Sequence, residues 1–393
     1  MAIAEKISQF MERSSWIRKM FEEGAALKAQ YGADQICDFT LGNPDVPAPP
    51  QVEEELIKII NEPAPLKYGY MPNAGFPETR AAVAGLLSDE QQVQVNPQGV
   101  VMTTGAGGAL NVIFKAILNP GDEVISPSPF FVEYNFYVDN HGGILRKLEQ
   151  TADFSLDLEA LAAAINEKTA AVIINTPNNP SGAIFSAEQI NALGELLVEK
   201  SKEYKRTIYL ISDEPYRKLV YDGLVVPPIF PAYRNSIIAN SYSKELSLAG
   251  ERIGYLALHP EADDFEMLAN GFLFTNRILG FVNAPGLMQR LVARLQGVTV
   301  DISIYQKKRD RLYQGLVEAG FKLVKPQGAF YLFPESPMAD DVEFVRILQQ
   351  YKILAVPGSG FSGPGHFRLS YCVDDATIER SLPIFKEIGA KFC

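Results

Sequence analysis

Apolar residues near the beginning of the chain recur at the spacing of helices. Between Ile3 and Tyr31 they recur every three or four places, with a break near Ser14 and Ser15, which is typical of two short amphipathic helices. Residues 40–77 then carry many prolines and glycines, which predicts an ordered but mostly irregular segment. We therefore expect an N-terminal helical arm followed by a long loop-like stretch, a kind of segment that often carries function.

Short apolar runs typical of strands follow, separated by helical patterns. This alternation favours a largely parallel sheet covered by helices, with binding loops at the carboxyl ends of the strands. Beyond a long helical stretch around 284–315 the pattern changes and predicts a smaller α+β domain. The expected strands of the first domain are 100–103, 123–126, 171–175, 208–212, 236–240 and 254–258, and those of the second are 320–325, 328–333, 353–356 and 367–372.

Composition narrows the class of protein. The 393 residues, 47% of them hydrophobic, exceed the usual size of one domain and suffice for a large core. A net charge of -11 leaves no basic field for nucleic acid or an anionic membrane surface. No apolar run approaches the roughly 18 residues that span a bilayer, and residues 1–30 lack a secretory signal. We therefore expect a cytoplasmic protein with no nucleic-acid or membrane partner.

Cysteine and histidine offer no metal site. The three cysteines at 37, 372 and 393 are widely separated and form no C-x-x-C pair, which argues against a disulfide framework or a zinc site. The histidines at 141, 259 and 366 show neither metal-ligand spacing nor a nucleophile arrangement. No metal is expected.

A glycine-rich turn follows the strand expected at 100–103. Gly105, Ala106 and Gly107 would bare backbone N–H groups at a helix N-terminus, where the helix dipole favours a phosphate. Glycine-rich turns after strands are more often only turns. The absence of a following Gly-Lys-Ser/Thr excludes a P-loop.

A lysine lies among hydroxyl residues between two expected strands. Ser241, Ser243 and Lys244, with Arg252 eight positions on, can place an amine beside an anion. A single lysine in a polar loop is more often merely solvated.

Two further turns follow strand-like runs. Asp213 ends one run and Tyr216 comes three residues later. A buried carboxylate at a strand end needs a cationic partner such as a protonated pyridine nitrogen, although a turn or N-cap aspartate is equally usual there. Asn179, in the Asn-Pro-rich turn 175–182, could donate a hydrogen bond to a phenolate-type oxygen. Such composition often marks only a tight turn.

An arginine interrupts an apolar strand near the C-terminus. Arg368 lies in Phe-Arg-Leu-Ser-Tyr, and burying its fork is costly unless it meets an anion such as a carboxylate. Exposure at a sheet edge is the alternative.

In order and spacing, these five motifs resemble those of the fold-type I, class I/II aminotransferases, the aspartate-aminotransferase-like family. The resemblance runs from Leu41-Gly42-Asn43-Pro44-Asp45 through Lys67-Tyr68-Gly69-Tyr70 and Gly328-Ala329-Phe330-Tyr331 to Arg368. It implies an α/β fold whose large domain has a mostly parallel seven-stranded sheet flanked by helices, with a smaller α+β domain and an N-terminal helical arm. The implied boundaries are 1–45 for the arm and part of the small domain, 46–290 for the large domain and 291–393 for the small domain.

The resemblance also implies pyridoxal 5'-phosphate as cofactor and assigns roles to the motif residues. Lys244 would carry the cofactor covalently and then move the proton, and Asp213 would keep the ring nitrogen protonated. Tyr216 and Asn179 would hydrogen-bond the ring oxygen O3′, and Phe131 would stack on the ring. The implied phosphate site comprises Gly105, Ala106, Gly107, Ser241, Ser243 and Arg252, and the catalytic residues are Lys244, Asp213 and Tyr216.

Substrates and assembly follow from the same resemblance. Arg368 would clamp the α-carboxylate of an L-amino acid or 2-oxo acid, with Gly42 and Asn179 nearby. Tyr70 matches a tyrosine that reaches the phosphate of the neighbouring subunit, so a homodimer is expected. The donor stays open between aspartate, an aromatic and another amino acid. Arg277 and Lys67 are candidates for reading a distal carboxylate, against the alternative of solvated surface charges.

Several other functions compete with transamination. A C–S β-lyase or another carbanion-forming enzyme would use the same cofactor, and a non-catalytic member of the fold would only bind it. The S-x-x-K pattern at 241–244 lacks the Ser-Asp-Asn and Lys-Thr-Gly partners of serine acyl-transfer enzymes. The G-x-G-x-x-G match at 358–363 precedes a proline and a strand instead of a helix, so it lacks the context of a dinucleotide site.

Overall fold

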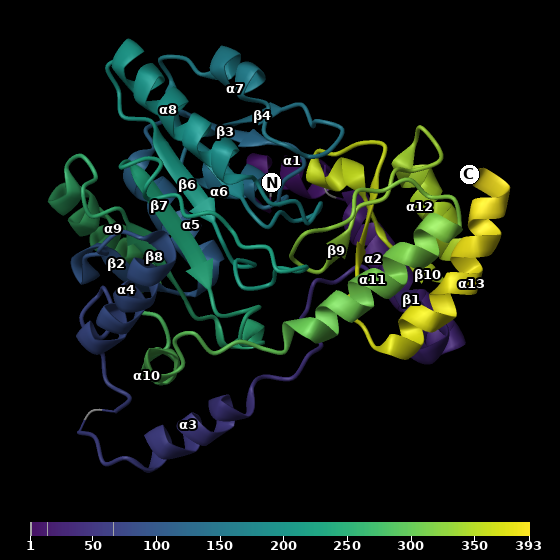
Figure 1. The fold of residues 1–393 in the computed structure, drawn as a ribbon, viewed down its shortest axis with the longest axis horizontal. Coiled ribbons are helices and arrows are strands. Elements are labelled where there is room, and N and C mark those ends of the chain that lie inside the picture. The colour runs from purple at the N-terminus through teal and green to yellow at the C-terminus, as the bar shows by residue number, and fades with distance from the viewer. Residues whose placement is uncertain (1, 14, 66) are drawn as a thin grey trace. The chain divides into compact units, whose positions relative to one another are not determined.

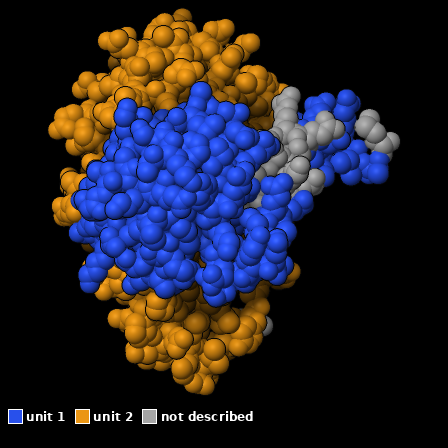
Figure 2. Space-filling model, turned by 90° about the vertical axis from the view of Figure 1, so that its right-hand side faces the viewer, with its two compact units in different colours: residues 1–42, 305–325, 330–393 blue, residues 43–304, 326–329 orange. Residues whose placement is uncertain are grey.

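A computed structural model describes residues 2–13, 15–65 and 67–393, and the side chains of all of these except residues 12–21. The chain forms two compact units, coloured separately in Figure 2. Unit 1 comprises residues 1–42, 305–325 and 330–393, and unit 2 comprises residues 43–304 and 326–329. Among the described residues no helix combines the length and apolar composition needed to cross a bilayer.

Unit 2 is built on a seven-stranded sheet (Figure 1). The strand order is β2-β8-β7-β6-β5-β3-β4, and only β8 runs antiparallel to its neighbours. The α/β architecture with a mostly parallel seven-stranded sheet is thus confirmed. The strands are β2 (Val100–Thr103), β3 (Glu123–Pro127), β4 (Ile144–Leu148), β5 (Thr169–Asn175), β6 (Tyr209–Asp213), β7 (Ser236–Ser241) and β8 (Gly254–Leu258).

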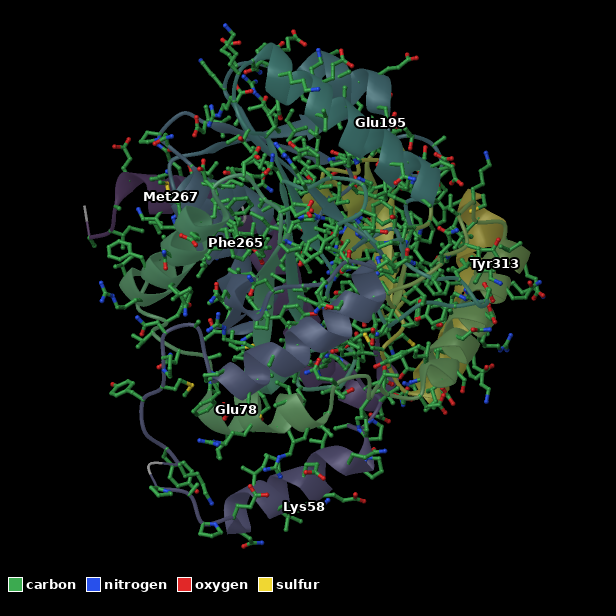
Figure 3. All side chains as sticks on the ribbon, turned by 60° about the vertical axis from the view of Figure 1, so that its left-hand side comes forward. Lys58, Glu78, Glu195, Phe265, Met267 and Tyr313 are labelled. Carbon is green, nitrogen blue, oxygen red and sulfur yellow. The ribbon has the colours of Figure 1, made fainter. Side chains whose placement is uncertain are left out.

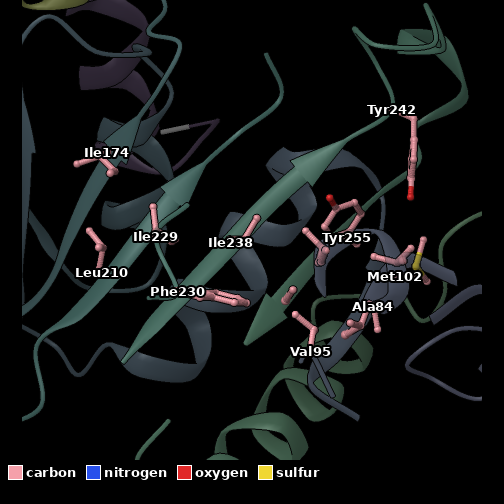
Figure 4. Packing of buried hydrophobic residues seen from close by; sticks show 14 of the residues in the cluster. Ala84, Val95, Met102, Ile174, Leu210, Ile229, Phe230, Ile238, Tyr242 and Tyr255 are labelled. Atoms are coloured by element: carbon pink, nitrogen blue, oxygen red, sulfur yellow. The ribbon is translucent and has the colours of Figure 1, made fainter. Parts of the chain in front are cut away.

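The central strands are buried on both faces because their alternate residues enter two different hydrophobic clusters. Val172 and Ile174 of β5 pack on one face, whereas Ala171 and Ile173 pack on the other. Figure 4 shows the first cluster, in which Ile174, Leu210 and Ile238 from neighbouring strands lie side by side. Burial on both faces is why these strands read as continuous apolar runs.

Helices supply the covering layers of unit 2. Helices α4, α8 and α10 contribute to the first cluster, and α5, α6 and α9 contribute to the second. Exposed polar residues lie on the outer surfaces of α4 and α8, as Glu78 and Glu195 illustrate in Figure 3, whereas α9 also exposes Met267, Phe274 and Ile278. The helices of this unit are α3 (Pro50–Asn61), α4 (Pro77–Gln91), α5 (Gly105–Ile117), α6 (Tyr134–Asn140), α7 (Leu158–Ala164), α8 (Ala187–Glu203), α9 (Phe265–Ile278) and α10 (Gly286–Arg294).

Unit 1 is an α+β unit with two small sheets. One sheet has the order β11-β12-β9 and is antiparallel, and the other pairs β1 with β10 in parallel. Its strands are β1 (Cys37–Asp38), β9 (Tyr331–Leu332), β10 (Ile353–Leu354), β11 (Val356–Pro357) and β12 (Phe367–Ser370). Its helices are α1 (Glu5–Arg13), α2 (Ser15–Tyr31), residues 305–318 of α11 (Ile302–Glu318), α12 (Asp341–Gln350) and α13 (Asp375–Phe392).

The structure corrects several predicted elements. The strand expected at 320–325 is wrong, because this segment forms no ladder with the described strands: the N–H groups of Gly320 and Phe321 bond back to α11, and the Lys322 carbonyl accepts from the Glu335 N–H at 2.8 Å. The expected strands 328–333 and 353–356 are shorter or divided. The long helix expected around 284–315 is interrupted after α10, where Gly297 takes a φ of +80°, a backbone conformation that favours glycine. Two helices do form in the N-terminal arm, while Ser14, at the expected break, lies outside the described residues.

Candidate active site

Four strand ends of unit 2 bring polar residues to one edge of the sheet. Because β2, β5, β6 and β7 point the same way, their carboxyl ends, Thr103, Asn175, Asp213 and Ser241, lie along that edge. Asn175 pairs directly with Asp213 in the ladder. The antiparallel strand β8 begins at the same edge with Gly254, between Thr103 and Ser241. The edge therefore gathers segments that are more than a hundred residues apart in the sequence.

The first turn of α5, Gly-Ala-Gly-Gly at 105–108, forms a cradle with no side chain larger than a methyl group. Gly105 has a φ of +74°, and a Cβ there would lie 2.8 Å from Nη2 of Arg252. A Cβ on Gly107 would lie 3.0 Å from the Tyr137 hydroxyl. The side chain of Thr104 makes no cap hydrogen bond to the first N–H groups of α5. N–H groups at a helix N-terminus, the helix dipole and an adjacent guanidinium are the features that bind a phosphate.

Asp213 is a buried carboxyl group with one oxygen engaged. Oδ2 accepts a hydrogen bond of 2.5 Å from the Tyr134 hydroxyl, whereas Oδ1 has no hydrogen-bond partner in the described part of the chain. Burial raises the pKa of this carboxyl to about 7, against the lowering effect of the Tyr134 hydrogen bond, and Glu214 raises it further. A buried acceptor without a donor is costly, so a cationic N–H donor placed at Oδ1 would stabilise the ionised form.

Two residues that hold this arrangement were not predicted from sequence. Tyr134 is fully buried on α6, and in the sequence it is indistinguishable from the aromatic core residues around it. Asn175 donates from Nδ2 to the Asp213 carbonyl at 2.8 Å and accepts from the Asn179 N–H at 2.7 Å. Asn175 thereby ties the turn that carries Asn179 to the strand that carries Asp213. Its position as the last residue of a strand was the available signal.

The structure brings Lys244 close to Tyr216. Nζ of Lys244 lies 5.9 Å from the centre of the Tyr216 ring, and both Tyr216 and Asn179 are buried. Phe131 packs its ring edge-on against Tyr134 with centroids 5.8 Å apart. Ser241 and Ser243 are also buried. All the residues predicted to bind a cofactor lie in unit 2, although Tyr70 is 94% exposed there.

Arg368 and Gly42 lie in unit 1. Arg368 occupies β12, the middle strand of its sheet, and its buried guanidinium lies 4.6 Å from the Tyr331 ring and 4.5 Å from the Phe361 ring. Nη2 donates to the Thr40 carbonyl at 2.7 Å. Exposure at a sheet edge is therefore excluded, and the flanking rings leave the plane of the guanidinium for hydrogen bonding.

Position 42, in the same unit, has no space for a side chain larger than that of glycine. A Cβ there would lie 2.1 Å from the Tyr331 hydroxyl, so any larger residue would displace the ring that flanks Arg368.

Across the described residues, no cluster of three His, Cys, Asp or Glu side chains is arranged to hold a metal ion.

Comparison with known proteins identifies the family. The family model described as aminotransferase class I and II matches residues 34–383. The chain belongs to this family. A probable aspartate aminotransferase of Methanocaldococcus jannaschii is 33% identical over 356 residues, covering 88% of this chain and 92% of that protein. The aspartate/prephenate aminotransferase of Thermus thermophilus is 34% identical over 364 residues, covering 91% of each.

Solved structures support the same assignment. A crystal structure of an aminotransferase from Eubacterium rectale matches with a TM-score of 0.96 at 39% identity, covering 100% of this chain and 99% of that one. The aspartate aminotransferase of Thermus thermophilus with maleate matches with a TM-score of 0.86 at 29% identity, covering 99% of this chain and 100% of that one. The protein is therefore a pyridoxal-phosphate-dependent aminotransferase, and the family implies its cofactor and its amino-acid and oxo-acid substrates.

We predict that Asp213→Asn changes how the stability of the cofactor-free protein depends on pH. The folded pKa of Asp213, about 7, lies above the ordinary value of 3.8. Its stabilising contribution is thus fully present below about pH 3.8 and is lost as the pH rises through about 7. Asparagine does not titrate, so the melting temperature of the variant minus that of the parent should become more positive from pH 5 to pH 8.

Asp153→Asn provides a control whose difference from the parent should not depend on pH in this range. A hydrogen bond from Ser155 is the main cause that lowers the pKa of Asp153 below its ordinary value of 3.8, so this carboxyl is ionised in the folded and the unfolded chain throughout pH 5 to pH 8. If the difference for Asp213→Asn also stayed constant over this range in thermal melts of the cofactor-free proteins, Asp213 would not carry the raised pKa.

Proposed function

We propose that pyridoxal 5'-phosphate binds at the described edge of the sheet in unit 2 and that Lys244 carries it. The observation that carries this proposal is Oδ1 of Asp213, a buried acceptor that finds no donor among the described residues and suits a protonated ring nitrogen. The glycine cradle beside Arg252 suits the phosphate, so the residues fit both ends of the cofactor. When bound, the cofactor supplies an aldehyde carbon for the amine and a cationic ring that accepts the electron pair released at Cα.

The phosphate-binding role falls to main-chain N–H groups and one cation. Gly105, Ala106 and Gly107 would donate from the first turn of α5, and Arg252, held by its Nη1 bond of 3.0 Å to the Ala249 carbonyl, would pair with the phosphate. Ser241 and Ser243 would complete the site, as in the family pattern. Since Ala106 and Gly107 carry no polar side chain, binding at this turn depends on backbone geometry.

Asp213 would keep the ring nitrogen protonated while Lys244 moves the proton. Once the substrate amine has released it, the ε-amine of Lys244 would serve as the base that takes the proton from the substrate Cα and as the acid that returns it. Tyr216 and Asn179 would donate hydrogen bonds to O3′, and Phe131 would stack on the ring. The ion pair at Asp213 is supported by its burial, because a low-dielectric setting strengthens it.

Arg368 would bind the α-carboxylate of both substrates, together with the Gly42 backbone and Asn179. A planar guanidinium offers two parallel hydrogen bonds to a carboxylate, and the flanking rings of Tyr331 and Phe361 support this role by holding the guanidinium in one orientation. We further propose the division into an arm with part of the small domain (1–45), a large cofactor domain (46–290) and a small domain (291–393).

We propose a homodimer as the active unit. Tyr68 and Tyr70 are 75% and 94% exposed, which is unusual for two neighbouring tyrosines. They border a cavity of about 610 Å³ lined by residues 67–71 and 281–288 together with Glu251. By the family pattern Tyr70 would reach the partner's phosphate site, and its full exposure within one chain supports this role.

The proposed amino donor is aspartate. The support comes from relatives named as aspartate or aspartate/prephenate aminotransferases and from the Thermus enzyme described with maleate, a dicarboxylate. The two candidates for binding the distal carboxylate differ in their surroundings. Lys67 donates a hydrogen bond to the Ile60 carbonyl at 2.6 Å, whereas Arg277 is exposed and lies over the Phe274 ring. A dicarboxylate would need one such cation in addition to Arg368.

We predict that Lys244→Ala lowers the rate of transamination by at least about a hundredfold, because general acid–base groups contribute roughly that much or more. The variant should still bind pyridoxal phosphate noncovalently through the cradle, Arg252 and Asp213, as measured by equilibrium dialysis. Lys168→Ala, at an exposed lysine, is the control and should behave like the parent. Full activity of Lys244→Ala would refute the assignment.

We predict that Arg368→Leu chiefly raises the KM for amino acids, by about ten- to a hundredfold, the range expected for a lost charged hydrogen-bond pair. The α-carboxylate is present in ground and transition states alike, so kcat should change less. Steady-state kinetics test this, with Arg346→Leu at an exposed arginine as control. An unchanged KM in Arg368→Leu would mean that another residue binds the carboxylate.

A donor screen distinguishes the remaining substrates and reactions. With 2-oxoglutarate as acceptor, kcat/KM should be higher for L-aspartate than for L-phenylalanine or L-alanine, and Arg277→Leu or Lys67→Leu should lower it for aspartate alone. Release of pyruvate and ammonia from an S-substituted cysteine, at a rate above that of any transamination, would instead favour the β-lyase alternative. Equal rates for all three donors would contradict a distal carboxylate site.

A further inference from the structure

A buried ionic cluster lies directly behind the Asp213 turn in unit 2. Nε of Arg217 is 3.2 Å from Oε2 of Glu90, and its Nη1 donates to Oε2 of Glu214 at 3.1 Å. Its Nη2 donates to the Val226 carbonyl at 3.1 Å, and Glu90 also pairs with Lys218. We call Glu90, Glu214, Arg217 and Lys218 the Arg217 cluster.

The cluster is closed to water at its centre. The side chains of Arg217 and Glu214 are 7% and 0% exposed, and Glu214 also accepts from the Ser212 hydroxyl at 2.8 Å. Two acids and two bases give it a net charge of zero when all are ionised. Burying charges is costly unless each is paired, so an arginine that meets two acids and a carbonyl at once makes this burial possible.

The cluster adjoins Asp213 through the chain itself. Ser212 and Glu214 flank Asp213 in sequence, and successive side chains of an extended strand point to opposite faces. The Glu214 N–H donates to the Ala239 carbonyl of β7 at 2.8 Å, which continues the ladder past the end of β6. The Asp213 side chain therefore lies on the face of the strand toward the proposed cofactor site, and the Glu214 side chain, which pairs with Arg217, lies on the opposite face.

We propose that Arg217 is a positioning residue for the aminotransferase reaction: by pairing with Glu214 and Glu90 together, it offsets part of the negative charge behind Asp213 and fixes the turn from Asp213 to Tyr216. This inference rests on the proposed role of Asp213 toward the cofactor ring. In this proposal Arg217 touches neither cofactor nor substrate. It acts by changing the charge state of Asp213, which would touch the cofactor.

The charged and titratable groups around Asp213 determine the sign of the effect. Tyr134 and Tyr137 face it from α6, and Glu214 and Tyr216 belong to its own turn. Glu214 raises the pKa of Asp213. Burial raises the pKa of Glu214 and Arg217 lowers it. Wherever Glu214 is ionised without Arg217 beside it, its unpaired charge would raise the pKa of Asp213 further and keep Asp213 neutral to higher pH. A neutral acid would not hold a protonated ring nitrogen, so binding of the ring should then require a higher pH.

The test measures binding of 4′-deoxypyridoxine 5'-phosphate to the cofactor-free full-length protein between pH 5 and pH 9. This probe keeps the ring nitrogen and the phosphate but has no aldehyde, so it cannot bond to Lys244. In Arg217→Met the midpoint of the affinity–pH profile should move up by about one pH unit, which lowers affinity at neutral pH by about tenfold. In Glu214→Gln the midpoint should move down.

The double variant provides the decisive comparison. Arg217→Met with Glu214→Gln restores a neutral cluster, so its midpoint should return toward that of the parent, and kcat with aspartate should recover with it. A profile that stays unchanged in Arg217→Met, or is no closer to the parent in the double variant, would overturn the inference. If Arg217→Met does not fold, Glu214→Gln decides alone: a midpoint that fails to move down would overturn it.

Two controls separate other causes. Arg146→Met breaks the pair of a surface arginine with the buried Glu123 and should leave the profile unchanged. Burial raises the pKa of Glu245 to about 8, with Lys218 lowering it and Glu90 raising it, so Glu245→Gln shows whether this acid contributes to the profile. If Glu245→Gln removes the pH dependence, the inference about Arg217 is wrong.

Asp213→Asn distinguishes the inference from the proposed function on which it rests. This variant should bind the probe weakly, and its affinity should not show the pH midpoint that the parent shows. If it keeps the parental profile, Asp213 is not the partner of the ring and the proposed function fails. If it loses the profile while Arg217→Met leaves it unmoved, only the role of Arg217 is refuted.

Discussion

The hydrogen bond from Tyr134 to Asp213 is the interaction on which the proposed site depends. It engages one oxygen of a carboxyl group that is otherwise out of reach of water and leaves the other without a donor. A carboxyl group in such a setting resists ionisation until a cation arrives. The apoprotein thus holds an acceptor in place before the ligand binds, and forming the ion pair with a ring nitrogen would recover part of the cost of its burial.

The parallel sheet is what brings the other groups to that carboxyl. The parallel strands β2, β5, β6 and β7 end at one edge, and β8 begins there. Thr103 and Ser241 both pair with Gly254, and Asn175 pairs with Asp213, whose other ladder partner, Ala239, lies two residues before Ser241. Both faces of the sheet are covered by helices, and each strand is fixed by apolar packing on its two sides. Functional loops can then vary at the edge while the buried strands keep their geometry.

Ionic interactions organise the side of the Asp213 turn away from the proposed cofactor site. Ser212 and Glu214 engage the Arg217 cluster, whereas Asp213 between them remains open at one oxygen. Paired charges therefore anchor the turn on one side, while on the other side Asp213 is held by its hydrogen bond from Tyr134. In unit 1 a comparable principle applies to Arg368, whose two aromatic neighbours fix its plane.

Local pattern alone determined the strands that are buried on both faces and the motif residues at their ends, because apolar runs and the polar residues that stop them are properties of the chain. It missed β4, whose mostly exposed residues (Ile144–Leu148) form an edge strand, and it wrongly predicted a strand at 320–325, because an extended apolar segment becomes a strand only if a partner is free to pair with it. The residues expected to bind the cofactor came from the resemblance to the class I/II aminotransferases. Only the tertiary structure decided that Tyr134 and Asn175 hold Asp213, and that Arg217 meets Glu90 across more than a hundred residues, since such contacts depend on which strand ends and helices the fold makes adjacent.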